Sequence, residues 1–566
     1  MTKGEKMHLR FSRAGHFWLD SGLVGLKKIL DETEKDVIIH EDADGFFLEG
    51  TKDAVIAAIE KAYDILIKQY YNISTQKQKE DTKAYNFYYD SKEGRFYSFP
   101  KKKSCGIAEV IYNKAPRPTG QMIKWAHKSE KKVEIYYQGK KFKRTIARLP
   151  DSHAHLQDSM DEFLNQNELD ITTAGLLYDA PYAVKPKINI KITNDNKKIK
   201  GHCYFCGQPS EVLEEATQTT FPLITGTSGV LSFNSMAQNP EKVCWKCSLL
   251  GKFVPVNGFY YTSGDNIFMF LPYSSSFEKM IDVFDSLHEA EYKDPNFYRN
   301  FDHGLDGFFY HVFEVAFAFL FTLYKKVLLH QKGGEEDFTV LDWEELLDLT
   351  LNKAPIEFYT MHARKEGNTF SIKTLWPFRE SVYFYLLLDH IEKNGVKIKE
   401  VMRLFYDPQE KNENATLKRN RICERILKKK SILDLVEIFV YGSERTYIKP
   451  IVDFLLIYEP EIRKDDSVMT REEQDTAVTL GRRIGAAVGK SEDGKKGDLY
   501  ALRKSRKKVD FLEQINRLQF KLGSAFIVPP DIYEGKLNDN NFQEFKQFCM
   551  IAALNSFNAA TSETKK

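Results

Sequence analysis

The sequence predicts a multidomain α+β protein, and three observations support this fold class. The first 200 residues mix amphipathic helix patterns with short strand patterns, two Cys-x2-Cys pairs follow, and helical periodicity dominates the rest of the chain. A chain of 566 residues has room for about three or four domains. We therefore expect a mixed α/β N-terminal domain at 1–200, a zinc-ribbon-like module with four cysteines at 201–272, a helix-rich middle domain at 273–462 and a C-terminal helical bundle at 467–566.

The N-terminal segment combines helix and hairpin signals. Asp20 or Ser21 is suited to cap a short helix that carries leucines at helical spacing, and residues 53–69 form a second amphipathic pattern. Two aromatic runs flank a short turn sequence that ends at Gly94, and a second pair of strand patterns flanks residues 138–139. Both arrangements predict β-hairpins.

Two histidine patterns have both a functional and a structural interpretation. His16 and Asp20 could act as an acid/base pair, but no third partner stands near them in the sequence, so we favour a polar turn against the first helix. His153 and His155 lie beside aspartates. Alternate residues do not share a helix face, and no complementary ligands stand out, so we do not expect a metal at this pair.

The two cysteine pairs carry the strongest chemical signal. The order of Cys203, Cys206, Cys244 and Cys247 is the spacing that places four thiolates around one tetrahedral Zn²⁺. Redox pairs and unrelated buried cysteines are the alternatives. A catalytic zinc keeps an open position, whereas four thiolates close the coordination shell, so we expect a structural zinc.

A long segment separates the two cysteine pairs. Its 37 residues exceed the roughly 15–20 of a compact zinc ribbon. Because the entropy of loop closure grows only logarithmically with length, the zinc would close the base of a long projecting loop. Small polar residues there are candidates for contact with base edges of a nucleic acid, namely Thr227, Ser228 and Asn234. A turn-rich surface of the zinc module is an equally good interpretation.

The composition predicts a cytoplasmic protein without a membrane anchor. The three cysteines outside the pairs lie far apart, which is typical of a reducing compartment, and the N-terminus lacks the apolar core of a signal peptide. Residues 307–324 are long and apolar enough to imitate a membrane span. His311 and Glu314 interrupt them, so we expect a buried helix instead.

A basic window covers residues 101–148. It holds 14 Lys and Arg against 3 Glu, a net charge of +11 in a chain whose total is +2. Aromatic residues interleave with these cations, which is typical of nucleic-acid contact, although lysine runs also form plain solvated faces. The candidate contacts in the window are Lys101, Lys102, Lys103, Arg117, Lys124, Lys140, Lys141 and Arg144.

The second half of the chain has mainly helical patterns. A strand-like pattern over 253–272 precedes them. Helices are expected at 277–289, 307–324, 343–351, 382–393 and 432–441, and, in the C-terminal bundle, at 470–488, 499–522 and 541–553. Further nucleic-acid contacts are expected at Arg482, Arg483, Arg503, Lys504, Arg506, Lys507 and Lys508.

One short sequence in the bundle imitates a nucleotide-binding motif. Residues 485–491 resemble a P-loop, but three residues separate the two glycines where the motif needs four. The sequence also lies in a helix pattern, whereas a P-loop follows a strand. We therefore expect no nucleotide site there.

Four features together resemble a known family. They are the stretch Ala14-Gly-His-Phe-Trp-Leu-Asp-Ser-Gly-Leu23, the widely separated cysteine pairs, the helical middle and the basic C-terminal bundle. In this combination the chain is similar to the CXXC–CXXC large subunit of type I-B CRISPR Cascade complexes. The resemblance covers the organisation of the whole chain. Its most specific parts are the N-terminal stretch, the cysteine pairs and the run from Leu480 to Lys521.

The resemblance implies a non-catalytic role in antiviral defence. Large subunits of this family bind the guide RNA complex and its backbone subunits, recognise the PAM in double-stranded target DNA, stabilise the R-loop with its displaced single strand, and present the site to a separate helicase–nuclease. Such a division of labour is physically reasonable, because base pairing with the guide reads the sequence. No membrane partner is implied.

The resemblance also implies that the C-terminal bundle stands in for the small subunit of the complex. In the family this part can also be made separately from an internal start codon, which supplies further small-subunit copies. Met469 is the natural candidate for that start.

Two interpretations from other functional classes are kept as alternatives. One is a zinc-ribbon enzyme that modifies nucleic acid, which would need a catalytic constellation that the sequence does not display. The other is a scaffold subunit of another nucleoprotein complex, for example a complex in which a guide RNA directs transposition.

Overall fold

The computed structural model of the chain describes most of its residues. These are residues 6–33, 37–66, 85–100, 121–171, 174–179, 199–216, 242–263, 265–289, 309–331, 357–366, 369–443, 445–463, 469–492, 494–523 and 526–564, with the single positions 188, 190, 192, 221 and 305. The chain divides into two compact units: unit 1 comprises Met1–Phe301 and Asn352–Arg379, and unit 2 comprises Asp302–Leu351 and Glu380–Lys566. The fold class is mixed α+β, as predicted. The division into four segments stays a prediction.

Unit 1 starts with a three-stranded antiparallel sheet. β1 (Lys6–Ser12) and β2 (Ile38–Asp42) both pair with the central strand β3 (Gly45–Thr51). The helices α1 (Phe17–Thr33) and α2 (Lys52–Leu66) follow the first and last of these strands in the chain. Their apolar residues and those on the inner face of the sheet join one hydrophobic core.

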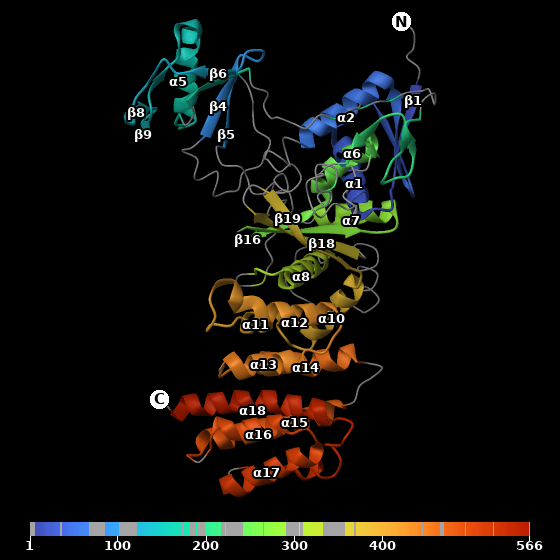
Figure 1. The fold of residues 1–566 in the computed structure, drawn as a ribbon, viewed down its shortest axis with the longest axis vertical. Helices are drawn as coiled ribbons and strands as arrows, with labels where there is room; N and C mark the ends of the chain where they lie inside the picture. The colour runs from blue at the N-terminus through green and yellow to red at the C-terminus, as the bar shows by residue number, and fades with distance from the viewer. Residues whose placement is uncertain are drawn as a thin grey trace. The chain divides into compact units, whose positions relative to one another are not determined.

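Helix α1 packs directly on α6 (Trp245–Asn257), and Figure 1 draws the two helices close together. Two glycines of α1 permit this approach. A Cβ atom on Gly22 would lie 1.9 Å from the carbonyl oxygen of Leu250, and one on Gly25 would lie 2.3 Å from that of Phe253. Any larger residue would force the two helices apart. The N-terminal stretch is therefore the surface on which α6 rests.

The start of the strand-like region differs from the prediction. The pattern over 253–272 was expected to form strands, but residues 253–257 are the end of α6, and the first strand is β16 (Phe259–Ser263). All residues of α6 except Lys246 are buried. A helix that is buried on every side has no amphipathic period, so its apolar run cannot be told from a strand by pattern.

A four-stranded antiparallel sheet completes this part of unit 1. Its order is β16, β17 (Asn266–Tyr273), β18 (Glu357–Glu366) and β19 (Thr369–Phe378), and α7 (Phe277–Glu289) follows β17 as predicted. The expectation of continuous helical structure in the middle of the chain is wrong at β18 and β19. β18 pairs with β17, which lies far earlier in the chain, and β19 pairs with β18, so long-range pairing and not local pattern defines this hairpin as part of the sheet.

Unit 1 contains a second sheet with the strand order β5-β4-β11-β6, and its apolar residues belong to a separate hydrophobic core. β4 (Tyr85–Asp90) and β5 (Arg95–Pro100) form the first predicted hairpin. β11 (Gly175–Tyr178) pairs with β4 in parallel and with β6 (Gln121–Lys124) in antiparallel orientation. The helix α5 (Gln157–Gln166) contributes its buried face to this core.

The second predicted hairpin consists of β8 (Val133–Tyr137) and β9 (Lys140–Arg144). Gln138 and Gly139 join the strands with positive φ angles of 47° and 79°. A two-residue turn with two positive φ values matches the right-handed twist of a hairpin. Lys140, Lys141 and Lys143 are exposed on β9, whereas Arg144 at its end is buried.

The regular secondary structure of unit 2 is all helical among its described residues. Its helices are α8 (Val312–Gln331), α10 (Ser381–Lys393), α11 (Ile398–Leu404), α12 (Leu417–Leu427), α13 (Leu433–Ser443), α14 (Lys449–Ile462), α15 (Arg471–Lys490), α16 (Lys496–Lys504), α17 (Lys508–Leu522) and α18 (Phe542–Thr564). α10 and α13 confirm the helices predicted at 382–393 and 432–441, whereas residues 343–351 lie outside the described residues.

The apolar segment that imitates a membrane span forms α8. Glu314 in this helix is fully buried, and its carboxylate accepts two backbone N–H groups at the start of α8 and the hydroxyl of Thr416 at 2.8 Å. It also pairs with the buried guanidinium of Arg419 at 2.8 Å. A buried carboxylate needs such partners. Among the described residues no helix is long and apolar enough to cross a membrane.

Helices α15 and α18 pack closely through small residues. A Cβ atom on Gly481 would lie 2.1 Å from the carbonyl oxygen of Cys549, and one on Gly485 would lie 2.0 Å from that of Ala553. Gly485, which belongs to the sequence that resembles a P-loop, therefore serves helix packing. α18 also continues to Thr564, beyond the end predicted at residue 553.

The single helix predicted over 499–522 is wrong. α16 ends at Lys504 and α17 begins at Lys508, and Lys507 between them has an extended backbone (φ −125°, ψ 157°). Like charges one helical turn apart disfavour a continuous helix through this basic run. Tertiary hydrogen bonds hold the break, because the Lys546 side chain of α18 donates to the carbonyl of Ser505 at 2.9 Å.

Candidate metal centre

The first cysteine pair sits in a tight turn between β12 (Gly201–His202) and β13 (Pro209–Ser210). The backbone N–H of Cys203 donates to the carbonyl of Gln208, and that of Gly207 donates to the carbonyl of Cys203, both at 2.9 Å. Gly207 has φ = 68°, a conformation that favours glycine. The turn therefore curls the chain around the two sulfur atoms.

The second pair lies where a strand becomes a helix. Cys244 ends β15 (Lys242–Cys244) and is the N-cap of α6, where its Sγ accepts the backbone N–H of Cys247 at 3.5 Å. β15 pairs with β14 (Leu213–Glu215), which follows the first pair. The backbone N–H of Tyr204 also donates to the carbonyl of Lys242 at 3.0 Å, so the backbone itself brings the two pairs together.

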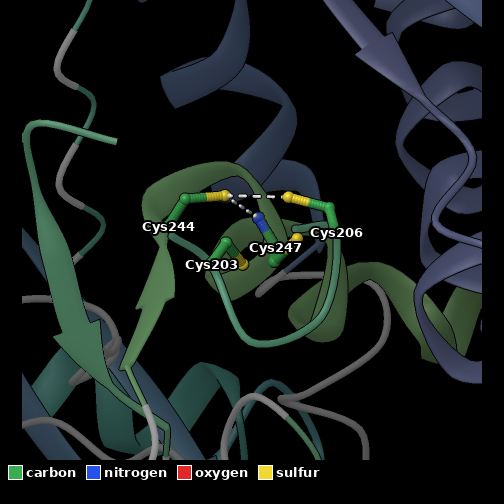
Figure 2. Close-up of side chains that lie close together, drawn as sticks. All are labelled: Cys203, Cys206, Cys244 and Cys247. Carbon is green, nitrogen blue, oxygen red and sulfur yellow. Dashed lines mark hydrogen bonds between the residues drawn. The ribbon is translucent and has the colours of Figure 1, made fainter. Parts of the chain in front are cut away.

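The four sulfur atoms form one cluster. They all lie within 4.8 Å of one another, and Sγ of Cys206 is 3.9 Å from Sγ of Cys244. Figure 2 shows the four side chains converging from the two turns. None of them is in a disulfide, and three of the four are buried. Tetrahedral coordination with metal–sulfur bonds of about 2.3 Å places sulfurs about 3.8 Å apart, so the group could hold a metal ion.

The electrostatics of the cluster favour a cation. Hydrogen bonds from the other three thiols lower the pKa of Cys203, whereas hydrogen bonding to Cys203 raises the pKa of Cys247. Burial disfavours the thiolate, so it opposes the lowering of the pKa of Cys203 and adds to the raising of the pKa of Cys247. Four thiolates at this distance repel one another strongly unless a cation lies between them, and a coordinated thiol is deprotonated outright.

A lysine lies beside the cluster. Lys246 occupies the second variable position of the second pair, and its Nζ donates to the carbonyl of Arg10 in β1 at 2.7 Å. The same Nζ is 5.8 Å from the centre of the Phe11 ring. Burial lowers the pKa of Lys246, and the neighbouring thiols oppose that shift. A divalent ion with four thiolates carries a net negative charge, which a lysine at this position would partly balance.

An aromatic cluster joins the first pair to α1. The ring of His16 lies 5.2 Å from that of Phe205 and 4.9 Å from that of Phe221. Burial lowers the pKa of His16 to about 4, and its Nδ1 has no hydrogen-bond partner among the described residues. His16 is therefore a neutral packing residue. Asp20 lies inside α1 and does not cap it as predicted, because the helix already begins at Phe17; its carboxylate accepts the backbone N–H of Ala14 at 2.8 Å.

Sequence reasoning missed the polar support of α6. Nζ of Lys252 donates to the carbonyl of Ser248 at 2.8 Å and lies 3.0 Å from its hydroxyl, which donates to Glu214 of β14 at 3.2 Å. Burial lowers the pKa of Lys252 to about 8. Helical spacing of Ser248 and Lys252 was the available signal, but the partner on β14 is not visible in the sequence.

The described residues hold no second group of three or more His, Cys, Asp or Glu that could bind a metal. His153 and His155 lie in a short 3-10 helix with rings 6.4 Å apart and no further ligand. The candidate centre presents four cysteines without a carboxylate or imidazole among its ligands. This donor set fits a closed site and not an open catalytic one.

Several predicted contact residues lie outside the described parts of the chain. They are Lys101, Lys102, Lys103 and Arg117 in the basic window and Thr227, Ser228 and Asn234 between the cysteine pairs. The structure therefore neither joins them to the metal centre nor separates them from it.

The described lysines of the basic window lie on exposed strands. Lys124 is in β6, and Lys140 and Lys141 are in β9. Lys140 pairs with Glu168 at 2.9 Å and Lys141 with Glu134 at 2.7 Å. Such exposed ion pairs are weak and leave the lysines free to exchange partners.

Arg144 has a different position. Its side chain is only 4% exposed, and the guanidinium pairs with Asp161 of α5 at 2.8 Å. The charge of Arg144 therefore helps to hold β9 to α5. A sequence count of basic residues cannot distinguish such a buried arginine from an exposed one.

The C-terminal cations also divide into two kinds. Arg482, Arg483, Lys504, Arg506 and Lys507 are exposed. Arg503, in contrast, pairs with Glu437 at 2.6 Å, and Lys508 lies 3.7 Å from Asp539.

Met469 is buried immediately before the N-cap of α15. The next residue, Thr470, caps that helix: its side chain accepts the backbone N–H of Glu473, and the Glu473 side chain accepts the N–H of Thr470 at 2.6 Å. A capping box of this kind satisfies two donors at the helix start.

A scan against protein-family models finds no match to this chain, and a search of curated proteins finds none either.

Proposed function

We propose that the chain is the non-catalytic large subunit of a type I-B CRISPR Cascade complex. The observation that supports this is that two of the features carrying the resemblance, the N-terminal stretch and the cysteine pairs, come together in unit 1. The stretch from Ala14 to Leu23 begins α1, the cysteine pairs form one cluster, and Gly22 and Gly25 allow the helix after the second pair to pack on α1. Features that carry the resemblance separately in sequence thus form a single structural element.

The metal of this unit is proposed to be a structural Zn²⁺. Cys203, Cys206, Cys244 and Cys247 would hold it, and the ion would supply charge neutralisation and a fixed distance between the two turns. The donor set of four sulfurs with tetrahedral spacing supports this identity. The chain between the pairs would then leave from a rigid base and could carry PAM recognition through Thr227, Ser228 and Asn234.

Duplex DNA is proposed to contact the hairpin of β8 and β9. Lys140 and Lys141 have side chains that are 76% and 50% exposed, and Tyr136, at 71%, lies on the same strand pair with Lys141 5.6 Å from its ring. Exposed lysines around a flat side chain suit phosphate and sugar contacts. Arg144 is left out of this surface because its charge is buried against Asp161.

The displaced single strand is proposed to follow exposed cations of the C-terminal bundle. Lys504, Arg506 and Lys507 lie together at the break between α16 and α17. The other partners follow from the resemblance: guide RNA with the repeated backbone subunits, separate small-subunit copies and a helicase–nuclease that performs the chemistry.

The decisive test is DNA binding by the assembled guide complex. A K140E/K141E variant and a K504E/R506E/K507E variant should each weaken binding to a matched target and reduce the salt dependence, because each lost phosphate contact removes about 0.9 from the slope on B-DNA and about 0.7 on a single strand. The matched control is K397E, a lysine 77% exposed in unit 2 outside both surfaces. Unchanged binding by both charge-reversal variants, or a salt slope near zero in the unmodified complex, would contradict the assignment.

The same experiment separates the alternatives. A chain that chemically alters the target without the helicase–nuclease would be an enzyme. A chain that joins the complex while neither variant changes target binding would be a scaffold. Randomised flanking sequences on the duplex report whether a PAM is read at all.

The small-subunit product is tested by expression. The capping box of α15 lies entirely after Met469, so a product that starts there keeps the local cap of its first helix. Expression should give a second, short product with Met469 at its N-terminus. Persistence of that product after replacement of the Met469 codon would place the start elsewhere.

A further inference from the structure

The helix α17 has one face that the fold covers and one that it leaves exposed. Phe511, Ile515 and Leu518 are buried. On the other side, Val509 is 59% exposed and Phe520 is 90% exposed, and no other large apolar side chain of the described residues is as exposed as Phe520. With so little of its ring covered, Phe520 gains almost no hydrophobic stabilisation from its own chain.

The exposed residues form a single row. At 100° per residue, the eleven residues from Val509 to Phe520 return to within about 20° of the same direction, so both side chains point to one side of α17. Glu513, Asn516 and Arg517 lie between them on that side, and Glu513 and Arg517 are 60% and 71% exposed. Their charged atoms are 3.9 Å apart, a distance at which an exposed pair contributes little.

The order of this row is self-complementary. It reads apolar, acidic, neutral amide, basic, apolar along the helix, so a second copy placed antiparallel and related by a two-fold axis near residue 515 sets apolar against apolar at the ends and acid against base nearer the centre. Val509 then faces the Phe520 of the second copy, and Glu513 faces its Arg517. A two-fold interface of this kind uses one surface patch twice, with each contact repeated.

We propose that α17 is a homodimerisation surface, paired antiparallel with α17 of a second copy of this chain through Val509, Glu513, Arg517 and Phe520. The exposed ring of Phe520 supplies the apolar anchor, and the two charge pairs fix orientation and register. The surface carries one acid and one base, so its charge does not favour a phosphate backbone. This inference does not depend on the nucleic-acid role proposed for the chain.

Local geometry keeps the surface in place without a partner. The hydroxyl of Tyr533 donates to the side chain of Asn516 on α17 at 2.8 Å, and Tyr533 is itself 53% exposed. The chain after α17 is thereby tied back to the helix beside the row. A single helix face gives a small interface, so we expect a reversible dimer and not an obligate one.

The test uses the full chain in analytical ultracentrifugation between about 1 and 200 µM, the range in which small reversible interfaces populate both states. The unmodified chain should move from monomer to dimer. F520D should raise the dissociation constant at least about tenfold, because it places a charge where an apolar anchor was. Tyr447→Asp is the matched control, since Tyr447 is 60% exposed in the same unit outside α17, and it should leave association unchanged.

Charge exchange tests the register. E513R and R517E should each dissociate the dimer, because each places like charges opposite each other. A mixture of the two variants should form a heterodimer, and the double variant E513R/R517E should associate again. As a control, each variant should unfold thermally at the same midpoint as the unmodified chain, which would show that it is folded.

Cross-linking gives an independent measure of orientation. The single variants V509C and F520C should form a disulfide with each other in a mixture. Neither should do so alone, because equal positions lie about 16 Å apart along an antiparallel helix pair.

Three results would overturn the proposal. They are a chain that remains monomeric up to the highest concentration, association that F520D does not alter, and charge variants that do not form the heterodimer. If F520D abolished nucleic-acid binding while self-association persisted, the surface would belong to nucleic acid instead.

Discussion

Cys244 performs two tasks with one sulfur atom. Its Sγ belongs to the metal cluster and also accepts the backbone N–H of Cys247, so the helix cap and the ligand are the same group. Gly207 supports the other pair with a positive φ that other residues rarely adopt. At the residue scale, the centre is therefore built from backbone contacts that lie within a few residues of each ligand. This locality is the reason that the ligands could be identified from the sequence.

Replacement of one ligand should empty the centre. C247S should lose the bound metal and several of the about 10–16 kcal/mol that a structural zinc site supplies to folding. The measurements are metal content by mass spectrometry and the unfolding midpoint. The control is C423A, which alters a buried cysteine of unit 2 and should retain one metal per chain. A C247S chain with full metal content would show that the four cysteines are not the ligands.

The pKa of His16 predicts an acid-sensitive contribution to stability. Burial lowers it to about 4, against about 6.5 in the unfolded chain, so the unfolded state binds more protons between these values. The contribution is present above pH 6.5 and is lost as the pH falls to 4, a change of up to about 3 kcal/mol. Chemical denaturation from pH 7 to 4 should therefore show a flatter profile for H16F than for the unmodified chain. Because acid also releases metal from both proteins, the difference between them carries the result, and parallel profiles would contradict the assignment.

At the element scale, glycines decide which helices touch. α1 meets α6 at Gly22 and Gly25, and α15 meets α18 at Gly481 and Gly485. In each case the backbone of the second helix occupies the space of a side chain. These pairs lie far apart in sequence, so the sequence shows the glycines but not their partners. One of these glycines, Gly485, also belongs to the sequence that imitates a nucleotide-binding loop.

Substitution of Gly485 tests this packing. G485A places a Cβ 2.0 Å from the carbonyl oxygen of Ala553, so α15 and α18 must separate, at a cost of about 1–3 kcal/mol or more. The matched control is G497A in α16, where no atom lies within 4 Å of the added Cβ and the helix should gain up to about 1 kcal/mol. Urea unfolding measures both. Equal stability of the two variants would mean that the helices do not pack through Gly485.

At the scale of the whole molecule, the candidate metal centre belongs to one of two compact units. The four cysteines lie in unit 1, and the helices α8 and α10 to α18 lie in unit 2. The hairpin of β18 and β19 belongs to unit 1, although helices of unit 2 stand on both sides of it in the sequence. The chain therefore passes from unit 1 to unit 2, returns for this hairpin, and passes to unit 2 again.

Metal removal should separate the thermal unfolding transitions of the two units. A strong chelator with a reductant should lower the unfolding midpoint of unit 1 by about 10 °C or more, because that unit loses its metal. The midpoint of unit 2 should not move. Calorimetry gives the two transitions, and hydrogen exchange at α6 and α18 assigns them. If both midpoints fell together, the units would unfold as one cooperative body.

The sequence by itself determined the features that depend on neighbours in the chain. These include the four candidate ligands, both hairpins of the N-terminal segment and the helix start at Thr470. Only the tertiary structure decided the rest. The pairing of β17 with β18, the burial of Arg144 against Asp161 and the break between α16 and α17 depend on partners far away in sequence. Local pattern reports a residue's propensity, whereas burial and long-range pairing decide which conformation is stable.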